Sequence, residues 1–191
     1  ELRQTHLGEG HLDTLRALGN LASLKFEQGR FSEAQQLTYE AVEGLRAAAG
    51  ADHALTLGVM NNLAQLYAAQ GKEVEALRIL GEALKFAPTN VQTLLITSRI
   101  QNKRGNFTAA EQGARAALRQ APANVDALIL LGQVLHETDR FEQALELLGK
   151  AVELAPENPE ALNFHGVALK SVGRLDEARE QILNSLEINA S

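Results

Sequence analysis

Residues 125–158 read VDALILLGQVLHETDRFEQALELLGKAVELAPEN, and this stretch carries two amphipathic patterns in succession. The first half places Leu128, Leu131 and Leu135 on one stripe at helical spacing. The second half carries another stripe, made of Phe141, Ala144, Leu148, Ala151 and Val152. Only residues 138–140 separate the two stripes, which predicts two antiparallel helices joined by a tight turn. A lone helical hairpin cannot bury both stripes, so we expect it to stack on copies of itself.

Three columns of residues show that such copies exist. One column of small residues is Ala34, Ala76, Ala110, Ala144 and Ala178, in which the first step is longer and the later steps are equal. A second small column is Ala41, Ala83, Ala117, Ala151 and Ser185. A turn column is Gly29, Gly71, Gly105, Asp139 and Gly173, and prolines end three units at Pro88, Pro122 and Pro156. Small residues are expected where two helices approach closely, and glycine where a turn needs a positive φ.

The unit resembles the tetratricopeptide repeat, a helix–turn–helix module of about 34 residues. The matching residues are Leu131-Gly132, Phe141, Ala144, Ala151 and Pro156. The resemblance implies an all-α fold, a right-handed α-solenoid of stacked hairpins. The chain is then expected to be one domain over 1–191, in which 1–13 is the end of an upstream repeat and its loop. The expected repeats are 14–55, 56–90, 91–124, 125–158 and 159–191.

The first two repeats have a longer pattern of their own. Gly8-x-x-His11-x-x-Thr14-Leu15 returns one repeat later as Gly50-x-x-His53-x-x-Thr56-Leu57. This longer pattern resembles the repeats of kinesin light chains. We expect His11 and His53 to brace the starts of two helices, and Asp13 or Thr14 to be the N-cap of the first.

Composition excludes several classes of function. The formal charge is −6, with 24 acidic and 18 basic residues, and the six Phe and two Tyr are the only aromatic residues. No basic run indicates a nucleic-acid partner, and no apolar run is long enough to span a membrane. The chain has no Cys, its His residues are scattered, and it has no catalytic motif. We therefore do not expect it to be an enzyme or to hold a metal or cofactor. We expect a cytoplasmic protein whose partner is a protein or peptide.

The resemblance also implies that the first helix of each hairpin lines a concave groove. The expected peptide-binding residues of the first two repeats are polar, namely Asn20, Asn61, Asn62 and Gln65. Those of the last three repeats are more apolar, namely Leu95, Ile96, Arg99, Lys103, Ile129, Leu130, Gln133, His136, Asn163, Phe164 and Val167.

Each group of these residues has two interpretations. Asparagine amides can clamp the backbone of an extended peptide, or they can bond neighbouring helices. The apolar residues exceed what the stripe of Leu94, Leu128 and Leu162 needs, which indicates a surface for an amphipathic helix, or else burial within the chain itself. Arg99 and Lys103 could receive an acidic residue of the ligand.

One known binding mode of the family is not expected. Chaperone-binding relatives hold a carboxylate with a clamp of Lys, Asn and Arg. In this chain only Asn62 matches the five clamp positions, so capture of a chaperone tail is not predicted.

The third repeat has the weakest pattern. Thr97 and Ala114 stand where neighbouring repeats have leucine, and Gly113 lies inside a helix at a cost of about 1 kcal/mol against alanine. We therefore expect this repeat to be the most mobile joint of the stack.

The sequence favours a non-catalytic scaffold that binds a peptide or an amphipathic helix in its groove. Two alternatives stay open. The chain could be the accessory part of a larger enzyme or signalling protein, or it could form homo-oligomers through an uncovered C-terminal face that carries Ile182, Leu186 and Ile188.

Overall fold

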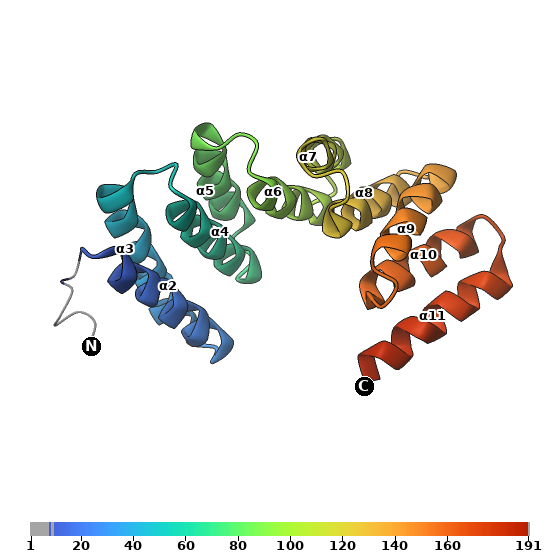
Figure 1. The fold of residues 1–191 in the computed structure, drawn as a ribbon, viewed down its shortest axis with the longest axis horizontal. Helices are drawn as coiled ribbons and strands as arrows, with labels where there is room; N and C mark the ends of the chain where they lie inside the picture. The colour runs from blue at the N-terminus through green and yellow to red at the C-terminus, as the bar shows by residue number, and fades with distance from the viewer. Residues whose placement is uncertain (1–7, 9, 191) are drawn as a thin grey trace. The chain divides into compact units, whose positions relative to one another are not determined.

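A computed structural model describes residue 8 and residues 10–190, and within that part the chain forms ten α-helices and no strand (Figure 1). The helices are α2 (Leu12–Glu27), α3 (Phe31–Ala49), α4 (Ala54–Ala69), α5 (Glu73–Phe86), α6 (Val91–Lys103), α7 (Phe107–Gln120), α8 (Val125–Glu137), α9 (Phe141–Leu154), α10 (Pro159–Ser171) and α11 (Leu175–Ala190). The all-helical fold is confirmed, and the expected repeat bounds stay a prediction. The expected end of an upstream repeat lies almost wholly outside the described residues.

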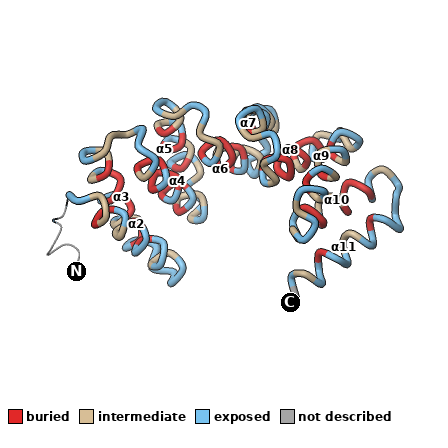
Figure 2. The backbone as a smooth tube through the Cα atoms, viewed as in Figure 1, coloured by how far each residue is buried: buried red, intermediate tan, exposed pale blue. Residues whose placement is uncertain are grey.

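The chain divides into two compact units, Glu1–Ile96 and Thr97–Ser191. In the first unit α2 packs on α3 and α4 on α5, while α4 also contacts α2 and α3. In the second unit α8 packs on α9 and α10 on α11, while α7 lies against α8 and α10 against both α8 and α9. Buried and exposed positions alternate along the helices, as expected when each helix packs with one part of its surface (Figure 2).

The two columns of small residues lie at the helix contacts. Ala34, Ala76, Ala110 and Ala144 are fully buried, as are Ala41, Ala83, Ala117 and Ala151, and the C-terminal members Ala178 and Ser185 are 3% and 4% exposed. The prediction that small residues mark close approach is therefore confirmed. Gly132 of α8 belongs to the same layer, because a Cβ atom there would lie 2.5 Å from Leu148 Cγ of α9.

The turn column ends the first helix of each hairpin with a residue of positive φ. Gly105, which follows α6, has a φ of 75°, and Asp139, which follows α8, has a φ of 58°. Aspartate is among the few non-glycine residues that adopt this region without a large penalty. The turn predicted at 138–140 is confirmed.

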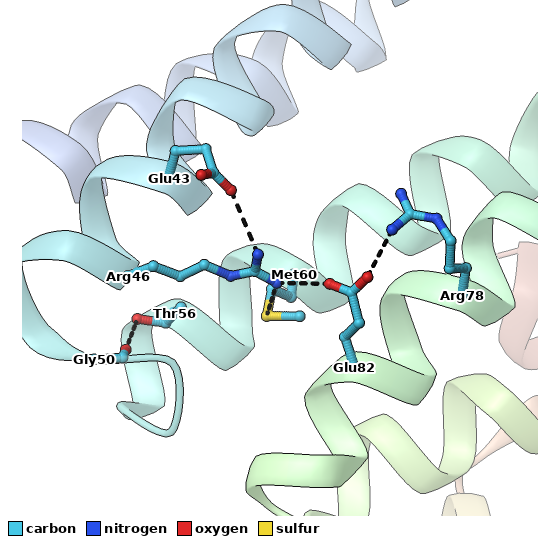
Figure 3. Close-up of polar contacts among 7 residues, drawn as sticks. All are labelled: Glu43, Arg46, Gly50, Thr56, Met60, Arg78 and Glu82. Carbon is cyan, nitrogen blue, oxygen red and sulfur yellow. Dashed lines mark hydrogen bonds and ion pairs between the residues drawn. The ribbon is translucent and has the colours of Figure 1, made fainter.

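Histidine side chains cap two helices of the first unit. Each of His11 and His53 accepts a hydrogen bond at its Nδ1 from the backbone N–H two residues later, at 3.2 Å in both cases. The expected bracing role is confirmed, but the N-cap prediction of Asp13 or Thr14 is wrong because α2 already begins at Leu12. The hydroxyl of Thr14 instead donates to the carbonyl of Gly8 at 3.0 Å. The hydroxyl of Thr56 likewise donates to the carbonyl of Gly50 at 2.7 Å (Figure 3).

An ion-pair cluster joins the first two hairpins. Arg46 of α3 donates from Nη2 to Glu82 Oε2 of α5 at 2.9 Å, and Arg78 donates to the other oxygen of Glu82 at 2.6 Å. Figure 3 shows Arg46 reaching past Met60 of α4, whose Sδ lies 3.6 Å from the same Nη2. The hydrogen bond from Arg46, together with the positive charges of both arginines, lowers the pKa of Glu82.

A similar cluster in the second unit joins α7 to Arg140, the N-cap residue of α9. Arg140 donates from Nη1 and Nη2 to the two oxygens of Glu111, at 3.1 and 2.6 Å, and Arg115 adds a third hydrogen bond at 2.8 Å. The bidentate bond from Arg140 is the main reason why the pKa of Glu111 is lowered and that of Arg140 is raised. The long-range pairs of the two clusters, Arg46–Glu82 and Glu111–Arg140, are not evident from the sequence, because their members lie 36 and 29 residues apart along the chain.

Across the described residues, none of the helices has both the length and the apolar character required of a membrane-spanning segment.

Candidate binding surfaces

Each compact unit has a pocket on the surface that its first helices help to form. The pocket of the first unit has a volume of about 130 Å³ and lies between α2, α3 and α4. Its lining residues are Ala22, Ser23, Phe26, Glu27, Thr38, Asn62, Gln65 and Leu66. Asn62 and Gln65, two of the predicted site residues, thus meet here with exposed amides. Asn20 is also exposed but does not line the pocket.

Asn61 has the alternative role that its residue type allows. It is only 4% exposed, and its Oδ1 lies 3.0 Å from the hydroxyl of Thr93 on α6. The same hydroxyl lies 2.9 Å from Asn90 Oδ1, which also accepts from the backbone N–H of Thr93 at 3.0 Å. Asn61 therefore bonds a neighbouring helix and is not part of the exposed binding surface.

The pocket of the second unit gathers four of the predicted residues in one place. It has a volume of about 230 Å³ and is formed by α6, α8, α9 and α10. The lining residues are Asn102, Gln133, His136, Glu137, Leu148, Phe164 and Val167. We call this set the Phe164 pocket. Leu148, Phe164 and Val167 are its apolar members, and the other four give it polar walls.

Hydrogen bonds hold two polar walls of the Phe164 pocket in place. The Nε2 of His136 lies 2.8 Å from the hydroxyl of Ser171, and the His136 ring packs against Phe141 with ring centroids 5.2 Å apart. Gln133 donates from Nε2 to Glu160 Oε1 at 3.5 Å, across α8 and α10. The Ser171 and Phe141 contacts restrict the His136 ring before any ligand binds, and the long bond to Glu160 restrains Gln133 only weakly.

Asn102 and Glu137 are polar residues of this pocket that the sequence analysis missed. The Oδ1 of Asn102 is buried and has no hydrogen-bond partner among the described residues. The carboxylate of Glu137 is on the exposed side of the pocket. The repeat spacing contained a signal for Asn102, because it occupies the position in its repeat that His136 occupies in the next.

Four apolar residues expected to line the groove are instead buried. Leu95 is 3% exposed, Ile96 7%, Ile129 1% and Leu130 2%. The interpretation of these residues as surplus apolar surface is wrong. For Ile129 and Leu130 the reason is that α8 contacts three helices, α7, α9 and α10, so a wide arc of its surface is covered.

The remaining predicted residues lie on the surface outside both pockets. Arg99 and Lys103 are exposed, and Arg99 Nη2 lies 3.6 Å from Asp126 Oδ1 within the unit. Asp126 thus takes the place that was expected for an acidic residue of a ligand. Asn163 is exposed on α10 but does not line the Phe164 pocket.

Family comparisons agree with this architecture. Two tetratricopeptide repeat family models match the chain, one over residues 13–89 and the other over 101–164. A comparison with curated proteins found no match.

Solved structures share the fold at low sequence identity. A putative kinesin light chain from Podospora anserina with nearly identical TPR-like repeats is 20% identical, with a TM-score of 0.73 over 94% of this chain and 97% of that one. A MamA protein is 19% identical, with a TM-score of 0.68 over 96% and 94%. YrrB, described as a TPR protein with an unusual peptide-binding site, is 17% identical, with a TM-score of 0.63 over 91% and 86%.

Proposed function

Because the chain belongs to the tetratricopeptide repeat family, we propose that it is a non-catalytic interaction module that binds a peptide segment or an amphipathic helix of a partner protein. The observation that carries this proposal is the Phe164 pocket, in which four residues expected for binding meet around one hollow. The described peptide-binding site of YrrB, which has the same fold, supports the same class of function.

The two pockets have different chemistry and so different roles in the proposal. Asn62 and Gln65 of the first unit present exposed amides, which can donate to and accept from a peptide backbone whatever its sequence. The Phe164 pocket has apolar walls of Phe164 and Val167 above the buried Leu148, and it takes one anchoring side chain. Burial of that anchor supplies most of the binding free energy.

The test is panning of a random peptide library on the whole chain, followed by fluorescence anisotropy with the enriched peptides. Phe164→Asp places a charge in the apolar wall and is expected to weaken binding at least about tenfold, while Phe164→Ala weakens it less. Leu154→Asp is the matched control, because Leu154 belongs to the same unit, is 51% exposed and lies outside the pocket. Circular dichroism checks that each variant stays helical.

Equal affinity of the wild type, Phe164→Asp and Phe164→Ala for every enriched peptide would refute the assignment of the pocket. Leu130→Asp is no substitute for these variants. Leu130 is 2% exposed, so a carboxylate there would unfold the repeat rather than report on binding.

Self-association through α11 is a second candidate function, favoured by apolar side chains on that helix. Leu175, Leu183 and Leu186 are 63%, 47% and 59% exposed. Leu175 and Leu183 also line a shallow pocket of about 310 Å³ together with Ile182. Light scattering should show a concentration-dependent mass that Ile182→Glu with Leu186→Glu removes. A constant monomer mass for the wild type would eliminate this candidate.

A further inference from the structure

We infer that the anchor of the partner is a basic side chain, arginine or lysine, which enters the Phe164 pocket with its charged end toward Asn102 and Glu137. This inference rests on the proposed function, because it names the chemistry of the group that the same pocket binds. The inference follows from the hydrogen-bond acceptors and carboxylates of the pocket walls, and from the lack of Lys and Arg among the described lining residues.

The walls of the pocket offer acceptors that the protein itself does not use. Asn102 Oδ1 is buried without a hydrogen-bond partner among the described residues. A buried acceptor left unpaired costs free energy. If the Asn102 amide rotates toward the pocket, a ligand that brings a donor recovers that cost. An aliphatic or aromatic hydrocarbon anchor brings no donor, so it would leave this cost in place. The guanidinium of arginine has five N–H donors, and the ammonium of lysine has three.

The charges around the pocket favour a cation. Glu137 has the only carboxylate among the described lining residues. A second carboxylate, that of Glu160, borders the pocket through its hydrogen bond with Gln133. Among the described lining residues there is no Lys or Arg that would balance an acidic ligand. The net charge of −6 also attracts basic partners at long range.

The apolar members of the pocket fit the rest of a long basic side chain. Arginine and lysine pack their methylene stems on apolar surface while the charged end stays near polar groups. Phe164 and Val167 provide that surface, with Leu148 beneath them. The face of the Phe164 ring can also attract a cation directly. The methylene stem, the positive charge and the N–H donors of an arginine or lysine side chain are therefore each matched by residues that line the pocket.

The inference is tested with mixtures of nonapeptides that have one fixed central residue among random neutral residues. The fixed residue is Arg, Lys, Leu, Phe or Glu, and the retention of each mixture on the immobilised whole chain is measured. We expect the Arg and Lys mixtures to be retained most strongly. Glu137→Gln should reduce their retention about fivefold, the size of a solvent-exposed ion pair. Asn102→Asp, which adds a further carboxylate to the pocket lining, should increase their retention.

A matched control separates the pocket from the general charge of the protein. Glu153→Gln removes the same charge from an exposed position on α9 outside the pocket, and it should leave retention unchanged. If Glu137→Gln and Asn102→Asp behave like Glu153→Gln, the basic residue binds elsewhere and the inference is overturned.

The outcomes also distinguish the inference from the proposed function. Strongest retention of the Leu, Phe or Glu mixture, lost in Phe164→Asp, would keep the proposed function and overturn the basic anchor. Retention of every mixture at the level of Phe164→Asp would overturn both.

Discussion

Gly132→Ala tests how closely the two helices of one hairpin approach each other. Gly132 lies in α8 and faces α9, where an added Cβ atom would lie 2.5 Å from Leu148 Cγ and 2.8 Å from Leu148 Cδ2. These distances are well inside van der Waals contact. Leu148 is 1% exposed and lines the Phe164 pocket, so the only space into which its branched side chain can turn is toward that pocket. The extra methyl group must therefore push the helices apart or force Leu148 out of its preferred rotamer.

Two effects of opposite sign decide the size of the change. Overpacking a tight core costs about 1–3 kcal/mol, with the upper part of that range expected where the contact is this short. Alanine in place of glycine inside a helix stabilises the folded state by about 1 kcal/mol, because it reduces the conformational freedom of the unfolded chain. The net result is a loss of about 1–2 kcal/mol in the free energy of unfolding.

Gly149→Ala in α9 is the matched control within the same hairpin. A Cβ atom at position 149 would meet only His165 Nε2, at an ordinary contact distance of 3.7 Å. Only the higher helix propensity of alanine then affects stability, and this variant should be about 0.5–1 kcal/mol more stable than the wild type. Urea unfolding followed by circular dichroism should move the two midpoints in opposite directions.

A Gly132→Ala protein as stable as the wild type would show that the hairpin relaxes at no cost and would refute the packing argument. A double-mutant cycle identifies the contact itself. In a Leu148→Ala background the clashing atoms are gone, so Gly132→Ala should become neutral or stabilising. An unchanged penalty in that background would mean that something other than Leu148 opposes the methyl group.

Three further predictions concern stability, motion and capping. The hydrogen bond from Arg140 is the main reason why the pKa of Glu111 is lower in the folded protein than its unfolded value of 4.5. The Glu111 carboxylate therefore stabilises the fold at pH values above 4.5, and this stabilisation is lost as the pH falls through the lowered folded pKa. Glu111→Gln should therefore flatten the acid limb of a stability-against-pH curve, and an unchanged limb would contradict the role of the pair. Amide hydrogen exchange should be faster in 91–104 and 107–120 than in neighbouring hairpins, because the third repeat has fewer large apolar residues, and slower exchange there would disprove the mobile joint. His53→Ala should lower the free energy of unfolding by about 1 kcal/mol, whereas His53→Asn, which keeps an acceptor, should lose less.

The sequence predicts the fold well because each repeat restates the same local constraints. A tight turn needs a positive φ, and the column of glycines together with Asp139 supplies it in every hairpin. Close helix contacts need small side chains, and the two alanine columns lie at those contacts. The failure of the Asp13 and Thr14 capping prediction has a physical cause. The ring nitrogen of His11 can also accept from a helix N–H, so the helix begins earlier than the usual capping residues would place it.

The binding surfaces are less predictable because exposure depends on how many neighbours a helix has. On a helix that packs on one side, adjacent apolar residues such as Ile129 and Leu130 could not both be buried. Since α8 contacts α7, α9 and α10, both side chains are covered, and the apolar excess of this helix reports its packing rather than a ligand.

The same reasoning indicates where a sequence does contain evidence for a binding surface in this fold. Apolar residues of a first helix can be absorbed by neighbouring helices, whereas polar residues at those positions must find a partner or stay near water. Asn61 is buried and accepts a hydrogen bond from the hydroxyl of Thr93. Asn102 Oδ1 has none among the described residues, and it lies beside the carboxylate-bearing wall of the Phe164 pocket. In the first helices of stacked repeats, polar residues without a structural partner are therefore better evidence for a ligand than apolar residues in excess.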